Sequence, residues 1–224
     1  QRQMCIRDRR SNIVRVITSI KSGKKVIALV APSIVGQYGL KITMGQVYSA
    51  LHKAGFADIV EVGIGADITA VKEAKEYIEK VPEKQPFMTS SCCPAFVKLV
   101  KTQIPEAVDK ISETDSPMVS TGRWVKEKYP NAITVFIGPC IAKKSEGREH
   151  SDIIDYVLTF EEAMCMLAGK DIKFADQPTN EFEREASKLG LGFPLTAGVT
   201  AAVDDTVRAM GGEVRSSYYA SGLD

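Results

Sequence analysis

The sequence has no long apolar run and almost no net charge. Of its 224 residues 44% are hydrophobic, and 29 Lys and Arg are balanced by 28 Asp and Glu. No stretch approaches the roughly 18 apolar residues of a membrane span, and the N-terminus lacks the apolar core of a signal peptide. Because basic and acidic residues are interspersed, we expect no binding to nucleic acid or to a membrane. A globular cytoplasmic protein is predicted.

Cysteine is scarce and unsuited to a disulfide framework. The five Cys are an odd number, and Cys92 and Cys93 are adjacent. Adjacent cysteines are poorly placed to join separate parts of a chain, so we expect reduced thiols or metal thiolates. Cys5 receives no role, because it lies in an Arg-rich segment, and residues 1–23 are expected to form a disordered or non-native leader.

Short apolar segments alternate with helical patterns through the rest of the chain. Strands are predicted at 26–31, 57–63, 87–91, 133–138 and 155–159, and helices at 45–56, 69–81, 95–101, 116–128, 160–169 and 195–212. Such alternation favours an α/β fold with largely parallel sheets. We predict two lobes, 24–128 and 129–224, each a small, mostly parallel sheet flanked by helices.

Sulfur and polar side chains follow three of the predicted strands, in the loops 31–33, 89–94 and 138–140. In parallel sheets the working residues gather in loops beyond the carboxyl ends of the strands. Cys92 and Cys93 precede a proline after one strand, and Cys140 follows a proline after another. A single Cys is often just a small buried residue, but thiolates from separate loops also hold iron-sulfur clusters. The shared placement indicates one site.

The context of these cysteines resembles a known metalloenzyme family. The segments TSSCCPAF and GPCIAKKSE resemble the first two signature motifs of the iron-iron hydrogenases, TSCCPxW and MPCxxKKxE. The similarity extends from about Lys24 to Gly212 and includes GADITAVKEAKE, ISETDSP and TAGVTAA. It implies a hydrogen cluster, in which a 4Fe-4S cubane is joined to a two-iron unit with CO, cyanide and dithiolate ligands. It also places this metal site at the interface of the two lobes.

The resemblance implies roles for individual residues. Cys93 and Cys140 match two cubane ligands, and Cys92 matches a non-ligating thiol that passes protons to the two-iron unit. Members of the implied proton route from solvent to this thiol are Glu73, Glu76 and Ser112. Implied contacts to the cyanide ligands are Pro32, Ser33 and Lys143. By residue type alone, the glutamates equally fit a solvated helix face and Lys143 a surface lysine; Lys144 is interpreted as solvated.

The match to the family is incomplete. The third motif, MACxxGCxxGGG, supplies two further cysteines, and nothing in this sequence corresponds to it. Cys165 is interpreted as a core residue instead. Phe96 stands where the common pattern has Trp, and Gly138 where it has Met. We therefore expect a fragment whose second lobe is incomplete at the C-terminus and which is inactive by itself.

Three functions stay open at this point. The first is an oxidoreductase that reversibly converts protons and electrons into dihydrogen, with an electron carrier such as ferredoxin and maturation proteins for the two-iron unit. The second is a hydrogen-sensing regulatory protein of the same fold. The third is a non-catalytic iron-sulfur assembly protein that lacks the two-iron unit.

Overall fold

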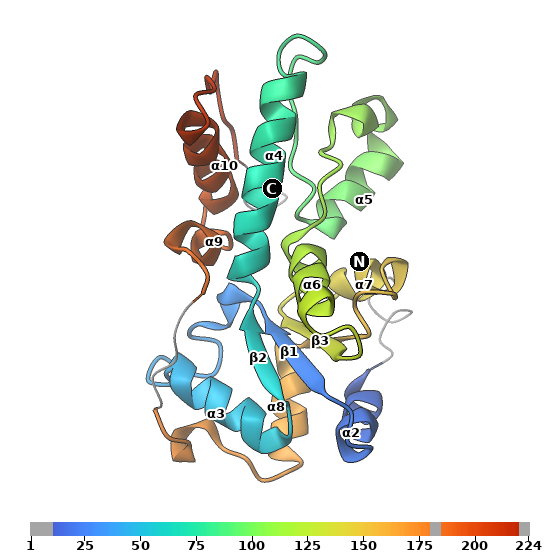
Figure 1. The fold of residues 1–224 in the computed structure, drawn as a ribbon, viewed down its shortest axis with the longest axis vertical. Helices are drawn as coiled ribbons and strands as arrows, with labels where there is room; N and C mark the ends of the chain where they lie inside the picture. Colours follow the sequence, from blue (N-terminus) through green and yellow to red (C-terminus); the bar gives the residue numbers. More distant parts are fainter. Residues whose placement is uncertain (1–10, 180–184, 220–224) are drawn as a thin grey trace. The chain divides into compact units, whose positions relative to one another are not determined.

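The computed structural model describes residues 11–179 and 185–219, which divide into two compact units (Figure 1). The first unit contains the chain up to Glu61 together with Thr121–Glu185, and the second contains Val62–Ser120 together with the chain from Ala186. Each unit is therefore assembled from two separate segments. The two lobes predicted from the sequence are each one continuous segment and differ from these units. Sequence order alone does not reveal that the chain returns to an earlier unit.

A four-stranded parallel sheet forms the centre of the first unit. Its order is β2 (Asp58–Glu61), β1 (Val26–Val30), β3 (Ile133–Gly138), β4 (Tyr156–Thr159). Every residue of β1 is buried, as expected for a strand covered on both faces. In the β1 and β3 register Val30 lies opposite Ile137, so these two strands end side by side.

Helices surround this sheet in the first unit. They are α2 (Ile13–Lys21), α3 (Met44–Ala54), α7 (Lys143–Glu149) and α8 (Phe160–Ala168), with the short 3-10 helices η1 (Pro32–Ile34) and η3 (Phe174–Asp176). Both α3 and α8 begin with a capping box, formed by Thr43 with Gln46 and by Thr159 with Glu162. These reciprocal bonds satisfy backbone groups that would otherwise lack partners at a helix start.

Part of the predicted leader is ordered. Residues 13–21 form α2, which buries Val16, so this stretch is not disordered as the sequence suggested. Cys5 and the rest of residues 1–10 lie outside the described residues. Within the described ranges, no helix combines the length and the apolar character needed to cross a membrane.

The second unit is mainly helical. It contains α4 (Gly63–Lys80), α5 (Pro94–Gln103), η2 (Pro105–Lys110), α9 (Lys188–Gly192) and α10 (Gly198–Ala209), and α6 (Pro117–Lys128) includes the boundary between the units. Both α9 and α10 pack against α4 (Figure 1). A Cβ at Gly190 would lie 2.2 Å from the carbonyl oxygen of Gly63, so α4 and α9 meet backbone to backbone.

The predicted strand at 87–91 is reduced to a single contact. Thr89 forms an isolated parallel bridge with Ile111, and in the described part of the second unit this bridge stands in place of a sheet. The α/β class with a small parallel sheet flanked by helices is confirmed, and that sheet belongs to the first unit.

Gly138 ends β3 at a position with no room for a side chain. A Cβ there would lie 2.4 Å from Cε1 of Phe136 and 3.4 Å from Cβ of Ala31, both of which are buried. We expect Gly138→Ala to lower the free energy of unfolding by about 1–3 kcal/mol, because overpacking a buried site forces its neighbours to shift. Urea denaturation measures the loss.

The matched control is Gly192→Ala, because a Cβ at Gly192 meets nothing within 4 Å. Its free energy of unfolding should change by less than about 0.5 kcal/mol. Equal losses in the two variants would contradict the packing explanation.

Candidate functional site

The carboxyl edge of the sheet gathers three of the predicted cofactor contacts in the first unit. After β1 the chain enters η1 at Pro32 and Ser33, and after β3 it reaches Cys140, which is half-buried. The backbone N–H of Ala31 donates to the carbonyl of Ile137 at 2.9 Å, so the parallel pairing continues to the strand ends. The two loops therefore leave neighbouring strands at the same edge, as the sequence predicted.

Two consecutive lysines begin α7, directly after the Cys140 turn. Lys143 Nζ pairs with Glu146 at 2.7 Å, and the two side chains are 12% and 11% exposed. Lys144 Nζ pairs with Glu162 at 2.6 Å and is only 5% exposed. The expectation of a solvated Lys144 is wrong, because its ammonium lies against the cap of α8, where Glu162 also accepts the backbone N–H of Thr159.

We expect Lys144→Met to lower the free energy of unfolding by about 3 kcal/mol, because it leaves the largely buried Glu162 carboxylate without its cation. The comparison is Lys84→Met, which removes an exposed pair with Glu79 whose side chains are 60% and 68% exposed. Exposed pairs contribute little, so the urea midpoint of this control should stay unchanged within error. A Lys144 variant as stable as the control would show that the buried pair is dispensable.

Cys92 and Cys93 form the turn ahead of α5 in the second unit. Cys93 is the N-cap residue of α5, its side chain is exposed, and Pro94 occupies the first helical position. Cys92 is half-buried and packs against a small apolar cluster made by Ala66, Ala70, Phe193 and Ala202. Adjacent cysteines thus have different surroundings: one thiol is exposed, and the other is covered by apolar side chains.

The carboxylate of Glu73 organises the turn before Cys92. Its Oε1 accepts the hydroxyl of Ser90 at 2.8 Å and the backbone N–H of Ser91 at 3.0 Å, and the residue is 1% exposed. The backbone N–H of Cys92 in turn donates to the Ser90 hydroxyl oxygen at 3.3 Å. Burial raises the pKa of Glu73, and the bonds from Ser91 and Ser90 only partly offset this.

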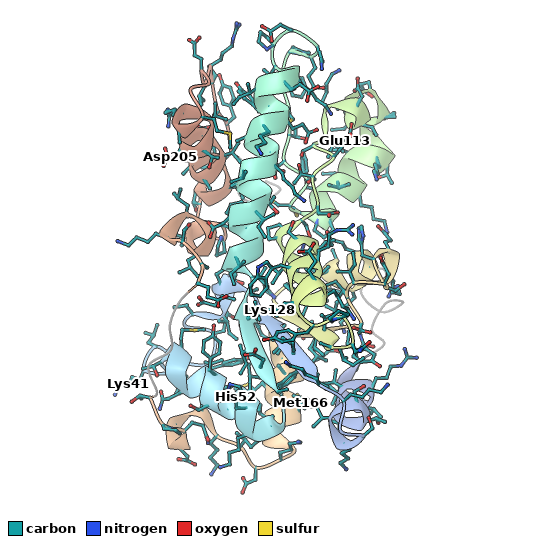
Figure 2. The ribbon with its side chains drawn as sticks, in the orientation of Figure 1. Lys41, His52, Glu113, Lys128, Met166 and Asp205 are labelled. Atoms are coloured by element: carbon teal, nitrogen blue, oxygen red, sulfur yellow. The ribbon has the colours of Figure 1, made fainter. Side chains whose placement is uncertain are left out.

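Glu76 lies one turn further along α4 in a more polar setting. It accepts the Ser112 hydroxyl at 2.6 Å, Lys80 Nζ at 2.8 Å and the backbone N–H of Glu113 at 3.1 Å (Glu113 is labelled in Figure 2). Burial opposes ionisation, yet these three donors together hold the pKa of Glu76 below its ordinary value. Hydrogen bonds to Glu76 and Glu113 raise the pKa of Lys80.

The two carboxylates are linked through the segment after η2. The Ser91 hydroxyl donates to the carbonyl of Thr114, whose own hydroxyl donates to Glu76 Oε2 at 3.2 Å. The structure therefore brings the predicted Glu73, Glu76 and Ser112 into one hydrogen-bonded region, together with Cys92. All of these residues belong to the second unit.

Several residues of this network escaped sequence reasoning. Lys80 carried a usable signal, because it follows Glu76 by four positions on a helix. Ser90, Ser91 and Thr114 carried none, since their partners depend on how the loop folds back onto α4. The interpretation of Cys165 as a core residue is wrong: it is exposed on α8, although its neighbour Met166, which is labelled in Figure 2, is buried.

The donor chemistry fits part of an iron-sulfur ligand set. Cys93 is the N-cap residue of α5 and Cys140 lies two residues beyond the end of β3, and neither thiol is buried, so each is accessible to a metal. Thiolates are the usual ligands of iron-sulfur clusters, which commonly take four. Among the residues that the structure describes, no group of three or more His, Cys, Asp or Glu lies ready to hold a metal ion.

We expect the free energy of unfolding of Glu73→Gln, relative to that of the native chain, to increase as the pH rises from about 5 to about 8. The raised pKa of Glu73 means that the folded state prefers the neutral carboxyl. The contribution of Glu73 to the free energy of unfolding of the native chain is therefore present at low pH and is lost as the pH rises through the folded-state pKa. Glutamine keeps an oxygen acceptor without this titration. Urea denaturation at several pH values measures the difference, whose slope is at most about 1.4 kcal/mol per pH unit.

The control for this series is Glu79→Gln, on the exposed surface of the same helix, where the pKa is lowered by Lys84. Its stability difference should not grow in favour of the variant over this pH range. A flat difference for Glu73→Gln would contradict a buried carboxyl with a raised pKa.

The fold and these cysteine turns define an iron-sulfur domain of the hydrogenase type. Residues 24–217 match the family model described as iron only hydrogenase large subunit, C-terminal domain. This match covers most of the chain, so the chain belongs to that family.

Individual relatives agree with this assignment. Iron hydrogenase 1 of Clostridium pasteurianum is 31% identical, over 86% of this chain and 38% of the relative. The cytosolic Fe-S cluster assembly factor NAR1 of Kluyveromyces lactis is 29% identical, over 58% of this chain and 28% of the factor. The apo FeFe-hydrogenase HydA1 of Chlamydomonas reinhardtii shares the fold, with a TM-score of 0.71 at 20% identity over 87% of this chain and 58% of that chain. The chain thus spans less than two thirds of each of these proteins.

Proposed function

We propose that this domain is the catalytic domain of an iron-iron hydrogenase, which reversibly interconverts protons and electrons with dihydrogen. The observation that carries the proposal is the buried Glu73 carboxylate, which holds the turn of a half-buried thiol, Cys92. An assembly protein that only binds a cluster has no need for a protonatable group at that place. Family membership supports the same activity.

Cys93 and Cys140 are the proposed thiolate ligands of the 4Fe-4S part of the hydrogen cluster. Pro32, Ser33 and Lys143 are the proposed contacts to the ligands of its two-iron unit. When bound, the cluster supplies the electrons and the metal at which dihydrogen is made or split. Two thiolates are half of the usual set, so a stable cubane requires ligands beyond these two.

The protein's own contribution is to hold and move protons. Glu76, with a lowered pKa, is ionised at neutral pH and accepts protons near exposed Glu113. Glu73, with a raised pKa, more readily holds a proton next to the Cys92 turn. Two carboxyls whose pKa values are pushed apart in this way suit successive steps of a proton route. Ser112 supplies a hydroxyl at Glu76, and Cys92 is the proposed final acid or base.

Partners and location follow from this function. An electron carrier such as ferredoxin would deliver or remove electrons, and maturation proteins would install the two-iron unit. We place the protein in the cytoplasm, where such carriers and reduced thiols coexist.

A second candidate is a non-catalytic role in iron-sulfur assembly. The similarity to the NAR1 assembly factor favours it, since that relative is 29% identical over 58% of this chain. Under this alternative Cys93 and Cys140 still bind a cluster, but the thiol of Cys92 has no proton to pass. A hydrogen sensor would use the same residues as the enzyme.

Cys92→Ala separates these roles. In protein that has the full set of cluster ligands and is produced with the maturation proteins, we expect this variant to keep the cubane absorbance and to lose hydrogen formation by about a hundredfold or more, because a positioned acid or base is removed. Cys93→Ala should lose the absorbance itself. Hydrogen formation with reduced viologen and the visible spectrum are the two measurements.

Cys165→Ala is the matched control, because this exposed thiol on α8 has no part in the proposed site. It should retain both absorbance and hydrogen formation. A native protein that binds the cluster but forms no hydrogen would favour the assembly role. Undiminished hydrogen formation in Cys92→Ala would overturn the role given to this thiol.

A further inference from the structure

We propose that Ser90 is a positioning residue, whose hydroxyl ties the backbone of Cys92 to the carboxylate of Glu73. Its hydrogen bonds hold the thiol at the end of the proton route, so the proposal deepens the function proposed above and rests on it. Neither the cysteine motif nor helix periodicity marks this serine. Two contacts of a single oxygen atom, that of the Ser90 hydroxyl, form the link.

The direction of both bonds at Ser90 is fixed by chemistry. A backbone N–H can only donate, so the contact of 3.3 Å from the nitrogen of Cys92 uses the Ser90 hydroxyl oxygen as acceptor. A hydroxyl has one proton, and the contact of 2.8 Å to Glu73 Oε1 takes it. Ser90 therefore links the two groups in series, with its donor and acceptor both in use.

The same geometry separates the two oxygens of Glu73. The contacts from the turn converge on Oε1, which accepts from the Ser90 hydroxyl and from the backbone N–H of Ser91. An oxygen whose lone pairs already accept hydrogen bonds is a poor place for a proton. A proton on Glu73 is therefore carried by Oε2. Oε1 remains an acceptor in both protonation states, so the turn keeps its bonds while a proton comes and goes.

Ser91 does not duplicate this link. Its hydroxyl donates to the carbonyl of Thr114 and thus connects the turn to the segment that also contacts Glu76. Only its backbone N–H makes a short contact with Glu73, and every residue other than proline would supply that group at position 91. The side chain that reaches both Glu73 and the backbone of Cys92 is that of Ser90.

Amide hydrogen exchange on the 224-residue chain tests the link directly. In Ser90→Ala the N–H of Cys92 loses its acceptor, so its exchange rate should rise about tenfold, the scale of one lost hydrogen bond. Ser90→Thr keeps a hydroxyl and should restore exchange to within about threefold of the native rate. Because Ser90→Ala also removes one donor from the buried Glu73, the thermal midpoint should fall by about a few degrees. Unchanged exchange at amides outside this turn distinguishes the local effect from general loosening.

Thr102→Val is the matched control. The Thr102 hydroxyl bonds only to carbonyls of its own helix, those of Lys98 and Leu99, and it lies outside the proposed site. It should leave exchange at Cys92 unchanged. An unchanged rate in Ser90→Ala, or a failure of Ser90→Thr to restore it, would overturn the proposal.

A second measurement connects the link to the proton route. In cluster-loaded protein, Ser90→Ala should slow hydrogen formation about tenfold at unchanged cubane absorbance, and Ser90→Thr should recover it. Faster exchange without slower hydrogen formation would overturn the positioning role. If native protein with the full set of cluster ligands forms no hydrogen, the proposed function fails, whereas the exchange result still decides whether Ser90 holds the turn.

Discussion

A buried carboxylate that must find hydrogen-bond donors is the constraint on which the second unit's site depends. An ionisable group as enclosed as Glu73 is costly unless donors reach it. Those donors come from Ser90 and Ser91, immediately before the cysteine pair. These hydrogen bonds to Glu73 on α4 therefore fix the conformation of the loop, and that conformation places Cys92 against the apolar cluster.

Glu73 and Glu76 share one face of α4, so their position on the helix does not explain why their pKa values shift in opposite directions. The groups that surround each carboxyl explain the difference. Apolar burial around Glu73 favours the neutral acid, while the ammonium of Lys80 and the hydroxyl of Ser112 favour the carboxylate of Glu76. A gradient of proton affinity thus arises along one turn of helix without any metal. Pairs of carboxyls whose surroundings push their pKa values apart in this way can take different protonation states at one pH.

The elements that depend on local sequence pattern were predictable. The contacts that form because the chain returns to an earlier unit were not. Strand and helix alternation predicted β1 and β3, and the rule for parallel sheets placed Pro32 and Cys140 at one edge. The burial of Lys144 was missed because its partner, Glu162, is eighteen positions away on another helix. Motif resemblance found Glu73 and Glu76, but a resemblance between motifs says nothing about which serine hydroxyl reaches which oxygen.

Both cysteine turns use the same physical device, although they lie in different units. Each turn leads directly into a helix, α5 after Cys93 and α7 soon after Cys140. Each is anchored by a buried ionisable group: Glu73 holds the first through the turn's serines, and the ammonium of Lys144 fastens the start of α7 to the cap of α8. Because removing one partner of a buried polar contact is costly, these anchors restrain the two turns. The exposed Cys93 and the half-buried Cys140 can then be held in fixed positions by groups that are not themselves proposed metal ligands.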